Sequence, residues 1–180
     1  MQDGTDLRER FLGAMSRAAC TVNVITTDGP AGRAGVTVSA MSPVSADMPR
    51  PTLLICVHHL SPAAERILEN GCFCVNVLSH DQADISDMFA GRRGERGRDR
   101  FACADWAAMP SGAPRVVDPL VGFDCLTATA RRVGTHHVIF GEVGEIFIAG
   151  RGSPLIYANR AYGTTAQLGP AARGCATPGE

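Results

Sequence analysis

Segments rich in β-branched and apolar residues run through most of the sequence, and they limit the folds that are open to it. Strands are expected at residues 20–27, 35–42, 52–59, 73–78, 119–132 and 135–149. Only short helical patterns lie between these segments, so the regular strand–helix alternation of a parallel sheet is missing from the sequence. This order predicts a mainly β fold, an antiparallel barrel with a few flanking helices.

Helical patterns occur at the edges of this β-rich sequence. Leu7, Phe11 and Met15 repeat at helical spacing and predict a helix over residues 5–18, whose apolar stripe is expected to pack in the core. Serine-led capping patterns mark the starts of two further helices, at residues 61–71 and 79–91. These helices are too short and too few to form a layer of their own, so they are expected to decorate the barrel.

The 180 residues are enough for one domain, which we assign to residues 1–168. Residues 91–100 consist mostly of Arg and Gly and predict an exposed, mobile loop. Residues 169–180 are rich in Gly, Ala and Pro, which predicts a flexible tail. The first residues lack a signal-peptide pattern, and the 7 cysteines contain no Cys-x-x-Cys pair, so a cytoplasmic protein with unpaired cysteines is expected.

Charge and missing motifs argue against several classes of function. The formal net charge is −1 and no apolar run is long enough to cross a bilayer, so neither nucleic acid nor a membrane is an expected partner. All 17 basic residues are arginine, which excludes a Walker A lysine and a Schiff-base lysine. The dinucleotide fingerprint Gly-x-Gly-x-x-Gly is also missing. No metal site is expected, because the adjacent histidines at 58–59 and 136–137 would point to opposite faces of a strand.

Hydroxyl side chains gather along one predicted strand and its exit, at Thr37, Ser39, Ser42 and Ser45. Thr37 and Ser39 share a face of that strand, where hydroxyls and backbone N–H groups can hold a phosphate. Ser61 opens a helix, and helix N-termini favour anions. The residues alone leave two interpretations open, a phosphate site or ordinary strand-edge hydroxyls with a plain helix cap.

The order of six sequence motifs helps to decide between a phosphate site and ordinary strand-edge hydroxyls. The sequences GVTVSAMSPVS, PTLLICVHHLS, CFCVNVLS, RDRFACADW, GTHHVIFGEV and PLIYANRAYG follow one another between residues 10 and 168. In this order they resemble the short-chain flavin reductases, the NAD(P)H:flavin oxidoreductase components of two-component monooxygenases. The resemblance implies a split β-barrel built as a homodimer, with flavin near the subunit interface. It also implies hydride transfer from NADH, or alternatively NADPH, to N5 of FAD or FMN, and a partner monooxygenase that takes the reduced flavin and attacks an aromatic, phenolic compound.

The resemblance extends to single positions. Its flavin-binding positions match Thr37, Val38, Ser39, Ala40, Ser45, Leu54, Ile55, Cys56, Val57, Ser61, Arg100 and Phe101. Its positions that contact nicotinamide or flavin match His136, Tyr157 and Tyr162, and His136 is the expected catalytic residue.

The sequence departs from the family pattern at three positions. Thr135 stands where the family usually has Asp, His59 replaces a frequent Arg or Lys beside the phosphate, and Ala63 replaces a frequent Thr or Ser. Phosphate binding is therefore expected to rest on serines, backbone N–H groups or an arginine of residues 92–100.

Two other functions fit the same resemblance. One is a flavoprotein that holds FMN tightly and acts directly on its own substrate, and the other is a non-catalytic flavin-binding module. The sequence leaves open the choice between FAD and FMN, the choice between NADH and NADPH, the identity of the partner oxygenase and the role of residues 91–100.

Overall fold

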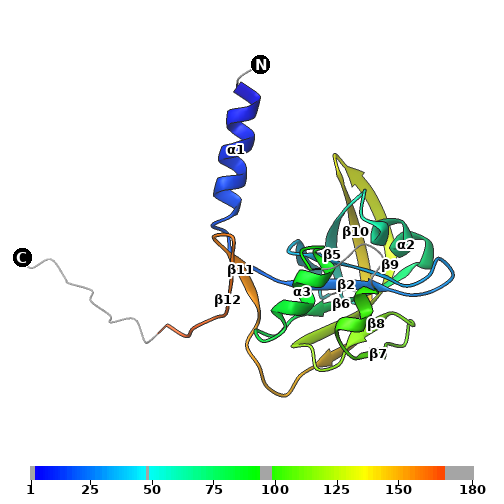
Figure 1. Ribbon diagram of the computed structural model, residues 1–180. Coiled ribbons are helices and arrows are strands. Elements are labelled where there is room, and N and C mark those ends of the chain that lie inside the picture. The colour runs from blue at the N-terminus through cyan, green and yellow to red at the C-terminus, as the bar shows by residue number, and fades with distance from the viewer. Residues whose placement is uncertain (1–2, 48, 94–98, 169–180) are drawn as a thin grey trace, which may run out of the picture.

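The computed structural model describes residues 3–47, 49–93 and 99–168 (Figure 1). Its helices are α1 (Asp3–Met15), α2 (Pro62–Asn70), α3 (Ala83–Phe89) and the 3-10 turn η1 (Arg100–Cys103). Its strands are β1 (Cys20–Thr21), β2 (Asn23–Thr27), β3 (Ala34–Val38), β4 (Met41–Ser45), β5 (Thr52–His58), β6 (Cys72–Val77), β7 (Trp106–Ala108), β8 (Pro114–Val116), β9 (Val121–Val133), β10 (His136–Ile148), β11 (Ile156–Ala158) and β12 (Ala161–Gly163). The predicted tail at residues 169–180 and the centre of the arginine-rich loop lie outside the described residues.

The main sheet is antiparallel and has the order β3-β2-β6-β9-β10-β5-β4. Its two edge strands, β3 and β4, are consecutive in the chain and meet at Ser39 and Ala40. The Cys56 N–H donates to the Ala40 carbonyl at 3.1 Å, so β5 already contacts the chain at this bend. One bent strand therefore pairs with β2 at its first half and with β5 at its second half. This arrangement confirms the predicted mainly β fold of split-barrel type.

The sequence pattern predicts a single strand over 35–42 and a loop after it, and the structure differs at both places. The bend divides the segment into two strands, and β4 continues through Pro43 to Ser45. Proline is tolerated here because β4 is an edge strand that has one partner, and the pairing with β5 shifts register at Pro43.

The barrel interior is filled by side chains that alternate along its strands. Ile25, Ile55, Phe73 and Ile139 are all 0% exposed, and α2 covers this core with Ala63, Ala64 and Ile67. Gly141 is required for this packing, because a Cβ there would lie 2.4 Å from Cζ of Phe73.

A second apolar cluster lies outside the barrel wall, between α3, η1, β8 and the approach to β11. Its buried members include Leu78, Phe89, Phe101, Val116 and Leu155. Phe101 and Phe89 meet edge to face, with ring centroids 5.1 Å apart. This cluster fixes α3 against the barrel, and the cavities described below lie on either side of it.

The two predicted capping patterns form to different extents. The Ser61 hydroxyl accepts from the Ala63 N–H at 3.4 Å, and α2 ends at Gly71 in the left-handed conformation with φ of 68°. At α3 the Gln82 side chain accepts from the Ser79 N–H at 3.0 Å, which is one half of a capping box. The helix begins at Ala83, directly after the predicted capping pair, and Gln82 is its N-cap residue.

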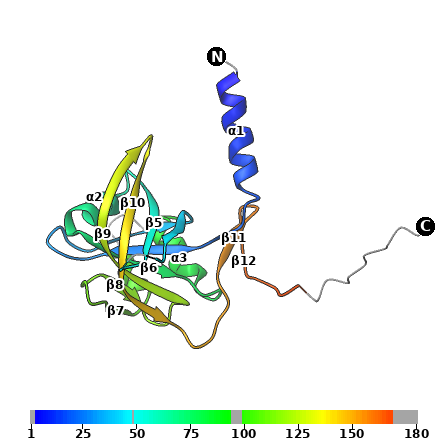
Figure 2. The same cartoon turned by 180° about the vertical axis from the view of Figure 1, so that it is seen from behind.

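Helix α1 does not pack as the sequence pattern predicts. Its apolar residues do not pack in the core: Leu7 is 66% exposed, Phe11 is 60% exposed and Met15 is 52% exposed. Both views show α1 extending away from the barrel (Figures 1 and 2). Helical periodicity identifies the apolar side of a helix but not the surface that covers it, which is why core packing was the wrong prediction.

The last strands form a hairpin beside the base of α1 (Figure 2). β11 pairs with β1 and with β12, and Asn159 and Arg160 make the turn with φ of 51° and 62°. Two consecutive positive φ values are typical of the tight turns that match strand twist. In the described part of the chain, no helix is long and apolar enough to cross a membrane.

Candidate functional site

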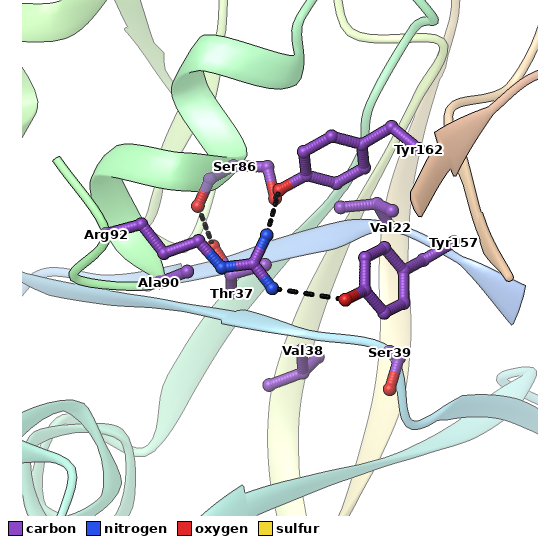
Figure 3. Close-up of a pocket in the computed structure, with 9 residues that line it drawn as sticks. All are labelled: Val22, Thr37, Val38, Ser39, Ser86, Ala90, Arg92, Tyr157 and Tyr162. Carbon is purple, nitrogen blue, oxygen red and sulfur yellow. Dashed lines mark hydrogen bonds between the residues drawn. The ribbon is translucent and has the colours of Figure 1, made fainter. Parts of the chain in front are cut away.

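A cavity of about 190 Å³ lies where β3, α3 and the β11–β12 hairpin meet (Figure 3). We call it the tyrosine pocket. It is lined by Val22, Thr37, Val38, Ser39, Ser86, Ala90, Arg92, Tyr157 and Tyr162. The structure thus brings together Thr37, Val38 and Ser39 of the predicted β3 segment and the two predicted tyrosines, which are far apart in the sequence. The predicted Ala40 does not line this pocket.

Hydrogen bonds hold the wall of the tyrosine pocket in place. The Tyr162 hydroxyl donates to Asp87 Oδ1 at 2.7 Å and lies 2.9 Å from Ser86 Oγ. The Thr37 hydroxyl donates to the Ser86 carbonyl at 2.7 Å, which ties β3 to α3. Partial burial raises the pKa of the Tyr162 phenol above its usual value near 10.0, and the Asp87 carboxylate adds to this effect. The phenol is therefore neutral at physiological pH.

Arg92 places a positive charge beside both tyrosines. Its guanidinium donates to the Tyr162 hydroxyl at 3.3 Å and to the Tyr157 hydroxyl at 3.4 Å, and it forms an ion pair with Asp87 at 3.3 Å. It also lies 5.5 Å and 5.7 Å from the centroids of the two tyrosine rings. Its hydrogen bond to Tyr157 raises the pKa of Arg92. The sequence offered Arg92 as one of several arginines of residues 92–100 for a phosphate, but it did not predict the contacts of Arg92 with Tyr157 and Tyr162.

A second cavity, of about 250 Å³, lies on the other side of the C-terminal end of α3. We call it the arginine hollow. It is lined by Arg33, Ala34, Gly35, Pro62, Ala63, Arg66, Phe89, Asp99, Arg100 and Phe101. The predicted Arg100 and Phe101 lie here, and the predicted Ser61 caps the helix whose first residues line it. Phe101 is only 8% exposed, so most of its ring packs in the second apolar cluster. Arg33 and Arg66 were not predicted.

The predicted β5 residues divide between two faces. Ile55 and Val57 are 0% exposed and point into the barrel, whereas Leu54 and Cys56 are half-buried on the other face. Burial raises the pKa of the Cys56 thiol. Ser45 is at the far end of β4, where its hydroxyl accepts from the Asp47 N–H at 3.3 Å, and it lines neither the tyrosine pocket nor the arginine hollow.

His136 lies in a third place, the histidine cluster of His58, His59 and His136. It is directly opposite His58 on β5, with ring centroids 4.9 Å apart, and His58 stacks on His59 at 5.1 Å. Thr135 Oγ1 lies 3.0 Å from Nδ1 of His136. Among residues 3–47, 49–93 and 99–168, no three His, Cys, Asp or Glu side chains are arranged to hold a metal ion.

The histidine cluster adjoins the start of α2. The Ser61 N–H donates to the His58 carbonyl at 2.9 Å, and the His59 N–H donates to the Thr135 carbonyl at 2.9 Å. Partial burial lowers the pKa of His59 below its usual value near 6.5, and Arg132 and the neighbouring histidines lower it further. His136 and Ser61 are therefore neighbours in the fold, and neither lines the tyrosine pocket.

Comparisons with known proteins identify the family that the sequence motifs resemble. The flavin reductase like domain matches residues 15–166. The protein named FMN reductase (NADH) RutF from Methylorubrum extorquens is 43% identical over 151 residues, which cover 84% of this chain and 72% of that protein.

Two solved structures of the same fold are named as components of larger enzyme systems. Nitrilotriacetate monooxygenase component B from Mycobacterium thermoresistibile is 27% identical with a TM-score of 0.82, covering 94% of this chain and 93% of that chain. BorF, the flavin reductase component of a bacterial two-component tryptophan halogenase, is 26% identical with a TM-score of 0.79, covering 89% of this chain and 99% of that chain. Since the domain matches residues 15–166 and a relative at 43% identity aligns with most of the chain, this protein belongs to the flavin reductase like domain family.

Proposed function

We propose that this protein is an NADH-dependent flavin reductase that reduces a freely exchanging flavin, FMN or FAD, and releases it to a separate oxygenase. The observation that carries the proposal is the tyrosine pocket, where two aromatic rings, strand hydroxyls and one guanidinium meet beside β3. Membership of the family and the name of the Methylorubrum extorquens relative, FMN reductase (NADH), support the choice of reaction and of cofactors.

The residues of the tyrosine pocket fit a flavin or nicotinamide ring. Tyr157 and Tyr162 offer flat apolar surfaces for stacking, and Arg92 offers a fixed positive charge for a phosphate or a negatively charged ring. The bound cofactors supply the chemistry, which is hydride transfer from nicotinamide to N5 of the flavin. The protein has to bind and align the two rings, and such alignment can lower the barrier of a reaction between two bound groups by several kcal/mol, up to roughly 7–11 kcal/mol.

A partner oxygenase is supported by the two solved structures, because both are named as components of larger systems. In the proposed cycle the reduced flavin leaves this protein and binds to the partner. An aromatic, phenolic substrate of that partner is part of the proposal and rests on the resemblance alone.

We also infer a homodimer in the cytoplasm. The apolar stripe of α1 is exposed, and a second copy of the chain would cover it. Further large apolar residues are exposed along β9 and β10: Leu126, Val133, Ile146 and Ile148. Free cysteines at buried and half-buried positions are compatible with a reducing compartment.

One set of assays tests the reaction. Purified protein is mixed with riboflavin, FMN or FAD, each with NADH or NADPH, and NADH oxidation is followed by absorbance. We expect a nearly colourless protein that oxidises NADH only when flavin is added. A tightly bound yellow flavin with turnover of another substrate would support the flavoprotein alternative. A yellow protein without any turnover would support a binding module.

A further inference from the structure

The tyrosine pocket and the arginine hollow open on the same face of β3. Gly35, Thr37 and Ser39 alternate onto this face, and α3 lies over its middle. The contacts are close: Thr37 bonds the Ser86 carbonyl, and a Cβ on Gly35 would lie 2.5 Å from Cε1 of Phe89. The two cavities therefore lie at opposite edges of α3. Arg33 and Thr37 are about 13 Å apart along an extended strand.

The arginine hollow carries an excess of positive charge. Its lining contains the guanidinium groups of Arg33, Arg66 and Arg100, and the only carboxylate among its lining residues is Asp99. Arg33 lies 3.6 Å from Asp99 and 4.4 Å from the centroid of the Phe101 ring. Arg66 donates to the Arg33 carbonyl at 2.7 Å, which holds its guanidinium beside the same segment.

Helix α2 adds to this field. Its first residues, Pro62 and Ala63, line the arginine hollow, and the partial positive charge of a helix N-terminus favours an anion there. The helix dipole alone would not define a site, but here it points into a cavity that already holds three arginines. Arginine is well suited to phosphate because its planar group can donate two parallel hydrogen bonds.

We propose that Arg33 and Arg66 bind a phosphate group of the nucleotide whose ring occupies the tyrosine pocket. This proposal rests on the proposed function, and it adds two binding residues from segments outside the arginine-rich loop. A ligand that reaches both cavities has a ring at one end and a phosphate at the other, and it has to pass around the C-terminal end of α3, because the contacts of Thr37 and Gly35 close the face of β3 beneath this helix. The terminal phosphate of FMN, the diphosphate of FAD and the diphosphate of NADH share this chemistry.

The test measures binding without turnover. Arg33→Gln and Arg66→Gln are made in the full chain, and quenching of flavin fluorescence is titrated with riboflavin, FMN and FAD. NADH binding is measured by its own fluorescence. We expect the phosphate-bearing ligand to bind about 10-fold more weakly to each variant, since a charge-assisted bond is lost. Riboflavin, which has no phosphate, should bind as it does to the wild-type protein.

Arg10→Gln on α1 is the matched control, because it makes the same change of charge far from the hollow on an exposed helix. It should leave every affinity unchanged. Equal losses for FMN and FAD would assign the hollow to the flavin phosphate, a loss for FAD alone to its diphosphate, and a loss for NADH alone to the nicotinamide nucleotide. Unchanged binding of all three nucleotides, or an equal loss for riboflavin, would overturn the proposal.

These titrations also separate the two proposals from each other. A wild-type protein that binds FMN or FAD but never oxidises NADH would refute the proposed reductase function. The difference between phosphate-bearing and phosphate-free flavin in the arginine variants would still decide the role of Arg33 and Arg66.

Discussion

Tyr162 and Asp87 are joined by a hydrogen bond of 2.7 Å, in which the phenol donates to the carboxylate. This contact connects the C-terminal hairpin to α3 across 75 positions of sequence. Asp87 also pairs with Arg92 at 3.3 Å, so one carboxylate positions both the ring and the charge of the tyrosine pocket. The geometry of the pocket therefore depends on how firmly the hairpin is held against the helix.

Replacing Tyr162 by Phe should loosen the hairpin. The change removes the bond to Asp87 and the contacts with Ser86 and Arg92, and we expect a loss of about 1–2 kcal/mol in the free energy of unfolding. Urea unfolding followed by circular dichroism measures it. Tyr157→Phe is the control, because its hydroxyl has one contact in the described structure, with Arg92 at 3.4 Å, and it should cost less. A larger loss for Tyr157→Phe would contradict this account.

His136→Ala should slow the reduction of flavin by NADH about 10-fold while flavin affinity changes little. The imidazole is exposed beside His58 and can hydrogen-bond a carboxamide or a phosphate. His137→Ala is the internal control, because His137 lies on the other face of β10, opposite Val57, and should have a much smaller effect. Stopped-flow bleaching of flavin at several NADH concentrations measures both. Wild-type rates for His136→Ala would remove this residue from the site.

Replacing Ser39 and Ser61 together by Ala should weaken the binding of FMN and FAD, by about 10-fold for each hydrogen bond to phosphate that is lost. The structure places these serines in different surroundings, since Ser39 lines the tyrosine pocket and Ser61 caps α2 beside the arginine hollow. The two single variants therefore show which end of the ligand carries the phosphate. The fold should survive, because a lost cap costs about 1 kcal/mol. Wild-type affinity in the double variant would refute the assignment of both serines.

Stability should fall with acidification through the titration of His59. The folded protein lowers the pKa of His59 below its usual value near 6.5, so between these two pKa values the unfolded chain binds more protons than the folded one. The contribution of neutral His59 to the free energy of unfolding is complete above pH 6.5, and it is lost as the pH falls through the pKa of His59 in the folded protein. Urea unfolding at several pH values should show a weaker decline for His59→Gln. An identical decline in both proteins would show that other groups cause it.

The homodimer should depend on α1. Light scattering of the wild-type protein should give about twice the monomer mass of 18.9 kDa. The double variant Leu7→Glu and Phe11→Glu puts charges on the exposed apolar stripe and should give a monomer. Glu9→Gln, an exposed position on the same helix, should remain a dimer. A wild-type monomer at micromolar concentration would count against the dimer, and a dimeric double variant against the role of α1.

The fold was largely predictable from local patterns, because the alternation of apolar residues along a strand and the capping residues of α2 and α3 involve positions that are close together in the sequence. The bend at Ser39 and Ala40 was not, because the segment GVTVSAMS keeps a strand pattern while its partner changes from β2 to β5. The exposure of α1 was missed for a related reason, since an apolar stripe on a helix does not indicate which surface covers it.

The candidate site was predictable in part. Thr37, Ser39, Tyr157 and Tyr162 do come together in one pocket. The contact of Arg92 with the two tyrosines was missed because they follow it by 65 and 70 positions, a pairing that no local pattern can reveal. Arg33 and Arg66 were missed because each is an ordinary exposed arginine until the fold places them around one cavity.

The bent strand formed by β3 and β4 also bears on how the barrel folds. Each half pairs with its sequence neighbour, β2 before it and β5 after it, so β2, β3, β4 and β5 pair as two hairpins of consecutive strands. Hairpins between neighbouring strands close short loops and cost little chain entropy. Within the main sheet, the strands paired across the longest stretch of sequence are β5 and β10, where Thr52 meets Glu142. We expect the formation of that pair, rather than of the bend, to be the slower step, because it closes the longer loop.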